Sequence, residues 1–437
     1  MAEKNQGQKL WQRAKTLIPG GNQLLSKRPE MFLPESWPTY FSKSETVFLW
    51  DLDNKKYLDM CLMGVGTNTL GYCNPVVDSA VIKTVSNGNM TTLNCPEEVM
   101  LAEKLIEQHE WADMVRFARS GGEANAIAIR IGRAASGRHN IAFCGYHGWH
   151  DWYLSANIEN EDNLTAHLLQ GLEANGVPSG LRGTSHPFKY GDLVHLKYLI
   201  QEKNIGVIKM EVARNKPADP KFLCSVRDLA TKHGIVLIFD ECTSGFRETL
   251  GGLHKIYKVA PDLAVFGKAL GNGYAITAII GRGDVMESAQ STFISSTFWT
   301  ERIGFTAAVA CISEMEKTES ASILPKNGKK MKNGWETLAK LHKLPIVIQG
   351  IDAIPNFYIE SDCWLEQKTF ISQQMLKKGI LASNIFYPSV CHQQSNFDQY
   401  FEQLDKVFGL IAEYPDATSL TGQLEGPVCH AGFNRLN

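Results

Sequence analysis

The run "IVLIFD" (235–240) is the most apolar strand-like stretch of the chain, and it ends on Asp240. Further short apolar runs stand at 114–120, 141–145, 205–212, 262–267 and 275–281. Helical stretches such as 222–233 lie between them. Apolar strands without polar alternation are typical of sheets covered on both faces, and helical crossovers join parallel neighbours. The pattern therefore predicts an α/β domain with a mostly parallel sheet and helices on both faces.

The two ends of the chain have a different pattern. Near the start, "TVFLWDLDNKKYLDM" (46–60) alternates around the turn residues Asp53 and Asn54, which predicts a hairpin. After about residue 310 the sequence favours a long amphipathic helix, and another helix closes this part near 398–414. We expect an N-terminal arm with part of a small domain (1–63), a large α/β domain (64–310), and the rest of a small α+β domain (311–437).

Composition bounds the function classes. The chain has 437 residues and a formal net charge of -2, so nothing in its charge favours nucleic acid or an anionic membrane as a partner. No apolar run reaches the roughly 20 residues of a membrane-spanning helix, and the start of the chain lacks a signal-peptide pattern. The 10 cysteines form no CxxC pair, which favours reduced thiols. We expect a cytoplasmic protein.

Polar residues gather where the apolar runs of the large domain end. They are Ser120-Gly121-Gly122, Tyr146-His147, Glu211, Asp240-Glu241 and Lys268. Ligands of open α/β sheets bind outside the carboxyl ends of the strands. These side chains are therefore the candidates for a binding site.

Each candidate also has an ordinary explanation. Ser120 is a suitable helix cap, Asp240 a suitable loop cap, and a single lysine such as Lys268 is most often a solvated surface charge. The pair His147 and His150 suggests a metal only weakly, because no third ligand is visible, and we expect no metal site.

Taken together, the strand ends favour a specific cofactor. A small-residue turn before a helix accommodates a phosphate, and an aromatic ring stacks on a planar group. A carboxylate pairs with a protonated ring nitrogen, and a lysine attacks a carbonyl to form a Schiff base. These are the groups with which a protein binds and activates pyridoxal phosphate.

The runs "LIFDECTSGFRE" (237–248) and "PDLAVFGKALGNGY" (261–274) closely resemble those of class III aminotransferases, which have pyridoxal-phosphate fold type I. Within that class the chain is most similar to glutamate-1-semialdehyde 2,1-aminomutase and its relatives. Further stretches with family counterparts are "WDLDNKKYLDM" (50–60), "LGYCNP" (70–75), "RSGGEANAIAIRIGRAASGR" (119–138) and "CGYHGWHD" (144–151). The resemblance covers nearly the whole chain.

The resemblance implies a role for each residue close to the cofactor ring. Lys268 would bind pyridoxal phosphate as a Schiff base and then act as the acid and base of proton transfer. Asp240 would pair with the ring nitrogen and keep it protonated. Tyr146 would stack on one face of the ring, and Cys242, where the family usually has valine, would pack on the other.

The resemblance also implies how the phosphate is held. Ser120, Gly121 and Gly122 would bind it, although the family usually has threonine or serine at position 122. Thr297 would reach the phosphate of a partner subunit, so that a homodimer would share its active sites. The remaining cofactor-binding positions implied are His147, Glu211 and Asn215.

The implied reaction moves an amino group between an amino donor and a small carbonyl acceptor, as in glutamate-1-semialdehyde aminomutase. Transfer within one substrate and transfer from a separate donor both stay open. The family's glycine-containing motif after Thr297 is replaced by Thr300-Glu301-Arg302, so a keto or aldehyde sugar or another polar metabolite is an alternative acceptor. Decarboxylation or racemisation, and a catalytically inactive cofactor-binding scaffold, are further alternatives.

Overall fold

The computed structural model describes residues 5–167, 169–213, 215–414 and 416–433. The chain forms two compact units, of which the first combines Met1–Asn74 with Ile323–Asn437 and the second is Pro75–Ser322. The second unit is an α/β fold with a mostly parallel sheet, as the sequence predicts.

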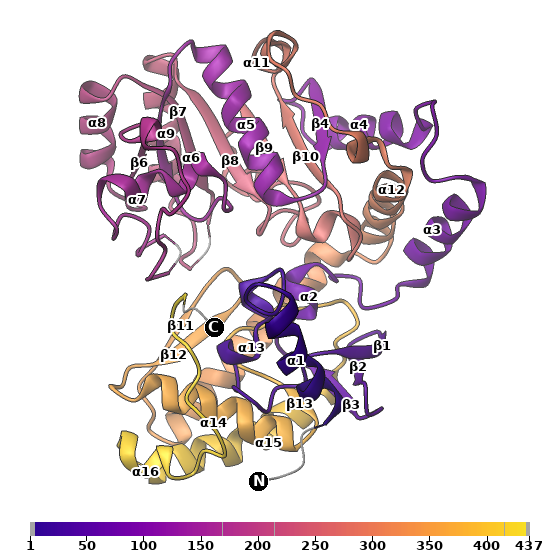
Figure 1. The fold of residues 1–437 in the computed structure, drawn as a ribbon, viewed down its shortest axis with the longest axis vertical. Helices are drawn as coiled ribbons and strands as arrows, with labels where there is room; N and C mark the ends of the chain where they lie inside the picture. Colours follow the sequence, from indigo (N-terminus) through magenta and orange to yellow (C-terminus); the bar gives the residue numbers. More distant parts are fainter. Residues whose placement is uncertain (1–4, 168, 214, 415, 434–437) are drawn as a thin grey trace. The chain divides into compact units, whose positions relative to one another are not determined.

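The large unit is built on one seven-stranded sheet in the order β4-β10-β9-β8-β7-β5-β6 (Figure 1). The strands are β4 (Met114–Ala118), β5 (Asn140–Cys144), β6 (Ser185–Pro187), β7 (Ile205–Glu211), β8 (Val236–Glu241), β9 (Leu263–Phe266) and β10 (Thr277–Gly281). β10 runs antiparallel to both of its neighbours, and the other pairs are parallel. β7, β8 and β9 consist entirely of buried residues, which explains their unbroken apolar runs.

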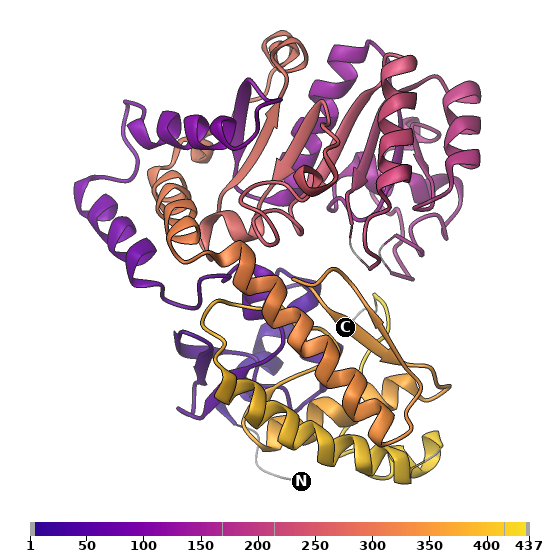
Figure 2. The same ribbon diagram turned by 180° about the vertical axis from the view of Figure 1, so that it is seen from behind.

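Helices cover both faces of this sheet. Helix α5 (Gly121–Ser136) crosses one face, where Gly132 allows close approach to Val207 and Ile238 (Figure 1). Helices α8 (Leu193–Glu202) and α9 (Pro220–Lys232) are seen from the opposite side (Figure 2). A side chain at position 132 would lie 2.9 Å from Val207 Cγ2, so the glycine sets the distance between helix and sheet.

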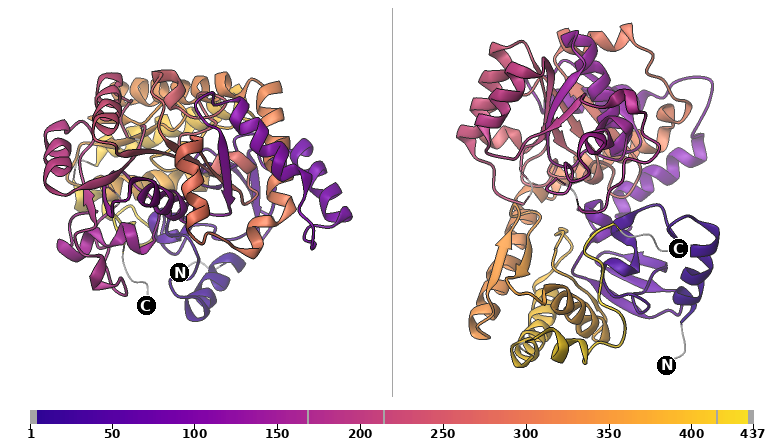
Figure 3. Two further views of the ribbon diagram at one scale, coloured as in Figure 1. Left: turned by 90° about the horizontal axis from the view of Figure 1, so that it is seen from above. Right: turned by 60° about the vertical axis from the view of Figure 1, so that its left-hand side comes forward.

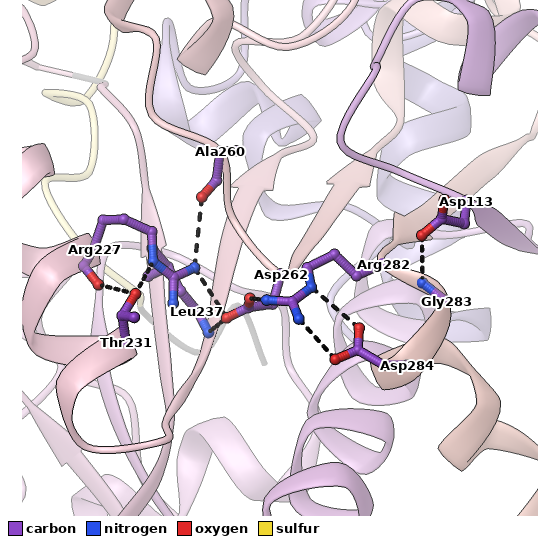
Figure 4. A network of polar contacts seen from close by, with 9 residues as sticks. All are labelled: Asp113, Arg227, Thr231, Leu237, Ala260, Asp262, Arg282, Gly283 and Asp284. Carbon is purple, nitrogen blue, oxygen red and sulfur yellow. Dashed lines mark hydrogen bonds and ion pairs between the residues drawn. The ribbon is translucent and has the colours of Figure 1, made fainter.

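The amino ends of β8 and β9 are joined by an ionic network around Asp262 (Figure 4). Asp262 Oδ2 accepts hydrogen bonds from Leu237 N at 2.8 Å and from Arg227 Nη1 at 3.0 Å. Asp262 Oδ1 accepts one from Arg282 Nη1 at 3.0 Å. The carboxylate is buried but fully paired, so this edge of the sheet is held by satisfied charges.

Three helices of the large unit pack together beside the antiparallel edge: α3 (Pro75–Asn87), α4 (Pro96–Glu107) and α12 (Arg302–Lys317). Their outer surfaces carry large exposed apolar side chains, including Ile82, Val85 and Val99. The short elements of the unit are α6 (Asp151–Leu154), α7 (Ala156–Glu159), η3 (Ser179–Leu181), α10 (His254–Tyr257), η4 (Lys268–Gly271), α11 (Gly283–Met286), η5 (Glu287–Ser291) and η6 (Thr297–Thr300). Among the helices that the structure describes, none has both the length and the apolar content needed to cross a membrane.

The small unit is α+β and combines the N-terminal segment, coloured indigo in Figure 3, with the C-terminal segment, coloured orange to yellow. The expected hairpin is confirmed as β2 (Phe48–Asp51) and β3 (Lys56–Asp59), which extend into the four-stranded sheet β1-β2-β3-β13. Its other elements are α1 (Gln6–Leu17), η1 (Leu25–Lys27), η2 (Pro29–Met31), β1 (Phe41–Glu45), α2 (Met63–Gly66), α13 (Ser320–Leu341, which begins in the large unit), β11 (Ile346–Gln349), β12 (Asn356–Ile359), α14 (Trp364–Lys377), β13 (Ile380–Leu381), α15 (Gln394–Glu413) and α16 (Ala417–Thr421). Strand β13, from the C-terminal segment, pairs in parallel with β3 and joins the two segments into one sheet.

Candidate active site

Asp240 lies at the carboxyl end of β8 and is 4% exposed. Its Oδ2 lies 2.8 Å from Nδ1 of His147, and its Oδ1 accepts a hydrogen bond from Cys242 N at 3.1 Å. Burial alone would raise the pKa of this carboxyl. The charge of Lys209 and the hydrogen bond from His147 outweigh burial, so the net effect is a lowered pKa. Asp240 is therefore held as a buried anion.

His147 is fully buried and faces an acceptor at each ring nitrogen. Nδ1 faces the Asp240 carboxylate, and Nε2 lies 3.2 Å from the carbonyl oxygen of Cys144. Because neither partner has a hydrogen to donate, both ring nitrogens carry one. His147 thus links Asp240 to the end of β5 as a cation.

Lys268 follows β9, which lies next to β8 in the sheet (Figure 1). Its side chain is half-buried, and Nζ donates a hydrogen bond to Thr243 Oγ1 at 2.7 Å. The backbone φ of +36° is unusual for a residue other than glycine and is the kind of strain found at functional sites. Thr243, in the turn after β8, is a contact of this lysine that the sequence analysis missed.

The turn Ser120-Gly121-Gly122 forms the start of helix α5. Ser120 caps the helix, since its Oγ accepts from Glu123 N at 3.4 Å while Glu123 Oε2 accepts from Ser120 N at 2.8 Å. The cap leaves the first-turn N–H groups of Gly121 and Gly122 without intrahelical acceptors. The ordinary role of Ser120 as a cap and a phosphate-binding role for the turn are therefore compatible.

The structure explains why residue 122 is a glycine. A Cβ atom there would lie 3.0 Å from Cδ2 of His150 and 3.3 Å from Cδ1 of Trp149. Gly148, with φ of +100°, packs so closely that a Cβ on it would lie 2.9 Å from the Cα of Gly122. The loop after β5 thus occupies the space that a threonine or serine side chain would need.

Tyr146 is positioned by its backbone and by Glu211. Its N–H donates to Glu211 Oε2 at 3.1 Å, and the preceding Gly145 has φ of +111°. A Cβ on Gly145 would lie 2.5 Å from the same oxygen, so only glycine fits. The carbonyl of Gly145 accepts from Tyr153 Oη at 2.9 Å, and its N–H donates to His167 Nδ1 at 3.1 Å. The aromatic turn is therefore rigidly held.

Cys242 lies between the α5 turn and the turn that carries Lys268. Its Sγ would be 3.5 Å from a Cβ on Gly121 and 3.4 Å from a Cβ on Gly267. Burial, with a contribution from Asp240, raises the pKa of the thiol, so it is a neutral packing group.

Two of the predicted residues are not joined to this cluster. Asn215 and Thr297 are both exposed, and in the described part of the chain no hydrogen bond or ion pair links either one to the other candidates. Thr297 begins η6, whose Trp299 donates through Nε1 to Glu123 Oε1 at 3.2 Å. Arg119 Nη2 donates to the Trp299 carbonyl at 3.1 Å. The segment is thus anchored on the α5 turn while Thr297 itself faces outward.

The residues present fit pyridoxal phosphate. The start of α5 offers backbone donors for an anion, Asp240 offers an ionised carboxylate for a protonated ring nitrogen, and Lys268 offers a primary amine. Because His147 and Cys242 N both donate hydrogen bonds to Asp240, its carboxylate acts as an acceptor only.

Comparison with known proteins gives the class. The chain matches the family model "Aminotransferase class-III" over residues 34–178 and 210–408, and it belongs to that family. It is a pyridoxal-phosphate-dependent aminotransferase.

Named relatives are similar over almost the full length. The chain is 30% identical to 3-aminobutyryl-CoA aminotransferase of Cloacimonas acidaminovorans, covering 89% of this chain and 92% of the relative. It is 29% identical to a glutamate-1-semialdehyde 2,1-aminomutase of Sulfurisphaera tokodaii, covering 89% and 95%. The solved FumI protein of Sphingopyxis sp. MTA144 has the same fold, with a TM-score of 0.84, 22% identity, and coverage of 93% and 96%.

Proposed function

We propose that this aminotransferase carries its cofactor on Lys268 and exchanges an amino group between an amino donor and a small carbonyl acceptor. The observation that supports this most directly is the placement of Lys268 and Asp240. They follow β9 and end β8, two neighbouring parallel strands, so an amine and a buried anion stand at the same sheet edge.

Each protein group has a defined task. Bound pyridoxal phosphate supplies an aldehyde that takes up amino groups and a ring that accepts an electron pair. Lys268 would hold the cofactor through Nζ and would act as the acid and base that moves a proton at the substrate carbon. Thr243 orients Nζ through its 2.7 Å hydrogen bond. Asp240, oriented by His147, holds the proton on the ring nitrogen.

The remaining residues bind and orient. Ser120, Gly121 and Gly122 bind the phosphate at the start of α5, where the helix dipole favours an anion. Tyr146 and Cys242 flank the ring. Glu211 holds the backbone of Tyr146. Asn215 is a further proposed cofactor contact.

We also propose a homodimer with shared sites. Exposed Phe293 (85%) and Phe298 (70%) flank the outward-facing Thr297, and isolated monomers rarely leave such large apolar groups in water together. In the dimer Thr297 binds the phosphate in the partner's site. Subunits carrying Lys268→Ala and subunits carrying Thr297→Val are then expected to regain activity when mixed, because each mixed dimer contains one intact site. Mixtures no more active than the separate variants would exclude sharing.

The acceptor is a small polar carbonyl compound, and amino transfer within one molecule, as in glutamate-1-semialdehyde aminomutase, is our first candidate. Transfer to a keto or aldehyde sugar is the second, because Thr300-Glu301-Arg302 replaces the family motif and Arg302 is engaged with Glu97 at 2.7 Å. All 10 cysteines are free thiols, which supports a reducing cytoplasm.

Borohydride reduction of the purified holoenzyme, followed by peptide mass spectrometry, tests the proposal. We expect the pyridoxyl mass on the peptide that contains Lys268, and a modification on another lysine would refute the assignment. Mixing holoenzyme with single amino acids and following the cofactor absorbance then identifies the donor. Conversion by one amino acid indicates a two-substrate reaction, whereas conversion only by a compound carrying both amine and carbonyl indicates internal transfer.

A further inference from the structure

A charged residue lies in the centre of the large sheet. Lys209 belongs to β7, is 0% exposed, and stands beside Phe143 of β5 and Ile238 of β8 in the strand register. Its Nζ has no hydrogen-bond partner among the described residues. A buried ammonium without a hydrogen bond is costly, so its presence calls for a compensating charge.

The compensating charge is Asp240. Glu211 pairs with Asp240 in the register, and Lys209 lies two residues earlier on the same face of β7. Burial lowers the pKa of Lys209, and Asp240 is the principal charge opposing that shift. In return, the charge of Lys209 lowers the pKa of Asp240.

Other groups near Lys209 come from β7, from the turns after β5 and β8, and from helix α5. β7 contributes Glu211, which accepts from Tyr146 N, and the turn after β8 contributes Cys242 as a neutral thiol. The turn after β5 contributes His147, itself a donor to Asp240. The buried residues of helix α5, which covers this face, are all uncharged. Asp240 therefore faces two cations before any cofactor binds.

We propose that Lys209 is a positioning residue that acts through Asp240 as a buried counter-charge and weakens the hold of Asp240 on a proton at the cofactor's ring nitrogen. This rests on the proposed function, in which Asp240 pairs with that nitrogen. Three cations then share one carboxylate: His147, Lys209 and the protonated ring. His147 and Lys209 are buried side chains, whereas the ring enters the site from solvent with the cofactor. The charges of the two side chains therefore control how strongly the ring nitrogen holds its proton.

Nuclear magnetic resonance of holoenzyme reconstituted with ring-15N pyridoxal phosphate measures this directly. A unit charge within about 4–6 Å shifts a neighbouring pKa by about 1–3 units. We expect Lys209→Met to move the ring-nitrogen titration upward by about one pH unit or more. Lys232→Met, at an exposed lysine of α9, is the matched control and is expected to leave it unchanged. Equal titrations in Lys209→Met and wild type would overturn the proposal.

A second measurement needs no cofactor. If Lys209 is an ammonium at neutral pH, its amine is protonated in both the folded and the unfolded chain. The difference in unfolding free energy between the Lys209→Met and wild-type apoproteins is then constant from pH 6 to 8. If the difference instead changes with pH by the amount expected for the uptake of one proton on unfolding, Lys209 is a neutral amine in the folded chain and the proposal is overturned.

The two hypotheses fail separately. Loss of the borohydride adduct at Lys268 would remove the proposed function, whereas a normal adduct with an unmoved ring titration would remove only the role of Lys209. Should Lys209→Met not fold, Lys209→Gln is the second variant, because it removes the charge and retains a hydrogen-bonding group. It is expected to shift the titration in the same direction.

Discussion

Asp240 and Glu241 are consecutive, both are buried, and they project to opposite faces of β8. Glu241 receives hydrogen bonds at both oxygens: Oε1 lies 2.7 Å from His254 Nδ1, and Oε2 accepts from Ser244 Oγ at 2.7 Å and Leu253 N at 2.8 Å. Asp240 has His147, one backbone N–H, and the unpaired ammonium of Lys209 nearby.

The two histidines show what this difference means. His254 accepts from Trp111 Nε1 at its Nε2, at 2.9 Å, so it donates only through Nδ1 and is neutral. His147 donates through both nitrogens. Glu241 is thus closed off by two hydrogen bonds at each oxygen, while in the described part of the chain each Asp240 oxygen receives one. A saturated carboxylate supports the fold, and an unsaturated one leaves room for a ligand.

The largest expected effect comes from removing the amine of Lys268. Lys268→Ala is expected to reduce kcat/KM by at least about 10³-fold, because it deletes both the attachment point and the proton carrier. The fold should survive, since the side chain is half-buried and the hydrogen bond that it makes among the described residues goes to Thr243. Steady-state kinetics and thermal unfolding check this, with Lys232→Ala as the control. Turnover near the wild-type level in the purified variant would contradict the assignment.

Asp240→Asn tests the face of β8 that carries Asp240. We expect about a 10²–10³-fold loss of kcat, because an amide does not hold the proton on the ring nitrogen. We also expect a loss of about 3 kcal/mol in unfolding free energy, because the charges of His147 and Lys209 are left uncompensated. Kinetics and urea unfolding measure the two losses. A variant that loses activity with unchanged stability would show that neither His147 nor Lys209 depends on the Asp240 charge.

Much of this comparison could be predicted from sequence, and the reason is topological. Apolar strands of a parallel sheet bring their carboxyl ends to one edge, so Asp240 and Lys268 could be assigned without coordinates. Lys209 could not, because one lysine within "IGVIKMEV" does not reveal which face it points to or what lies opposite. The contact from Thr243 depends on a turn with unusual backbone angles. Thr297 needs a second subunit, which no single-chain pattern describes.

Glu241→Gln is the matched test on the closed face. The amide leaves one oxygen to accept and presents an N–H to former donors, so we expect a loss of about 1–3 kcal/mol in unfolding free energy. Because this carboxylate faces away from the cofactor side, we expect kcat to stay within about threefold of the wild type. Urea unfolding and steady-state kinetics separate the two. A fall in kcat as large as that of Asp240→Asn would end the distinction between the faces.

The smallest expected effect is a pH dependence confined to the closed face. Burial lowers the pKa of His109 to about 4, and its Nε2 accepts from Gly252 N at 3.0 Å while Nδ1 lies 2.7 Å from the Leu105 carbonyl. The folded pKa is below the unfolded value of about 6.5, so the unfolded chain takes up the proton first as pH falls. This contribution to stability is complete above pH 6.5 and is lost toward pH 4, by about 1–2 kcal/mol between pH 7 and 5. His109→Gln should flatten that part of the profile in denaturant titrations. A profile that His109→Gln leaves unchanged would contradict this assignment.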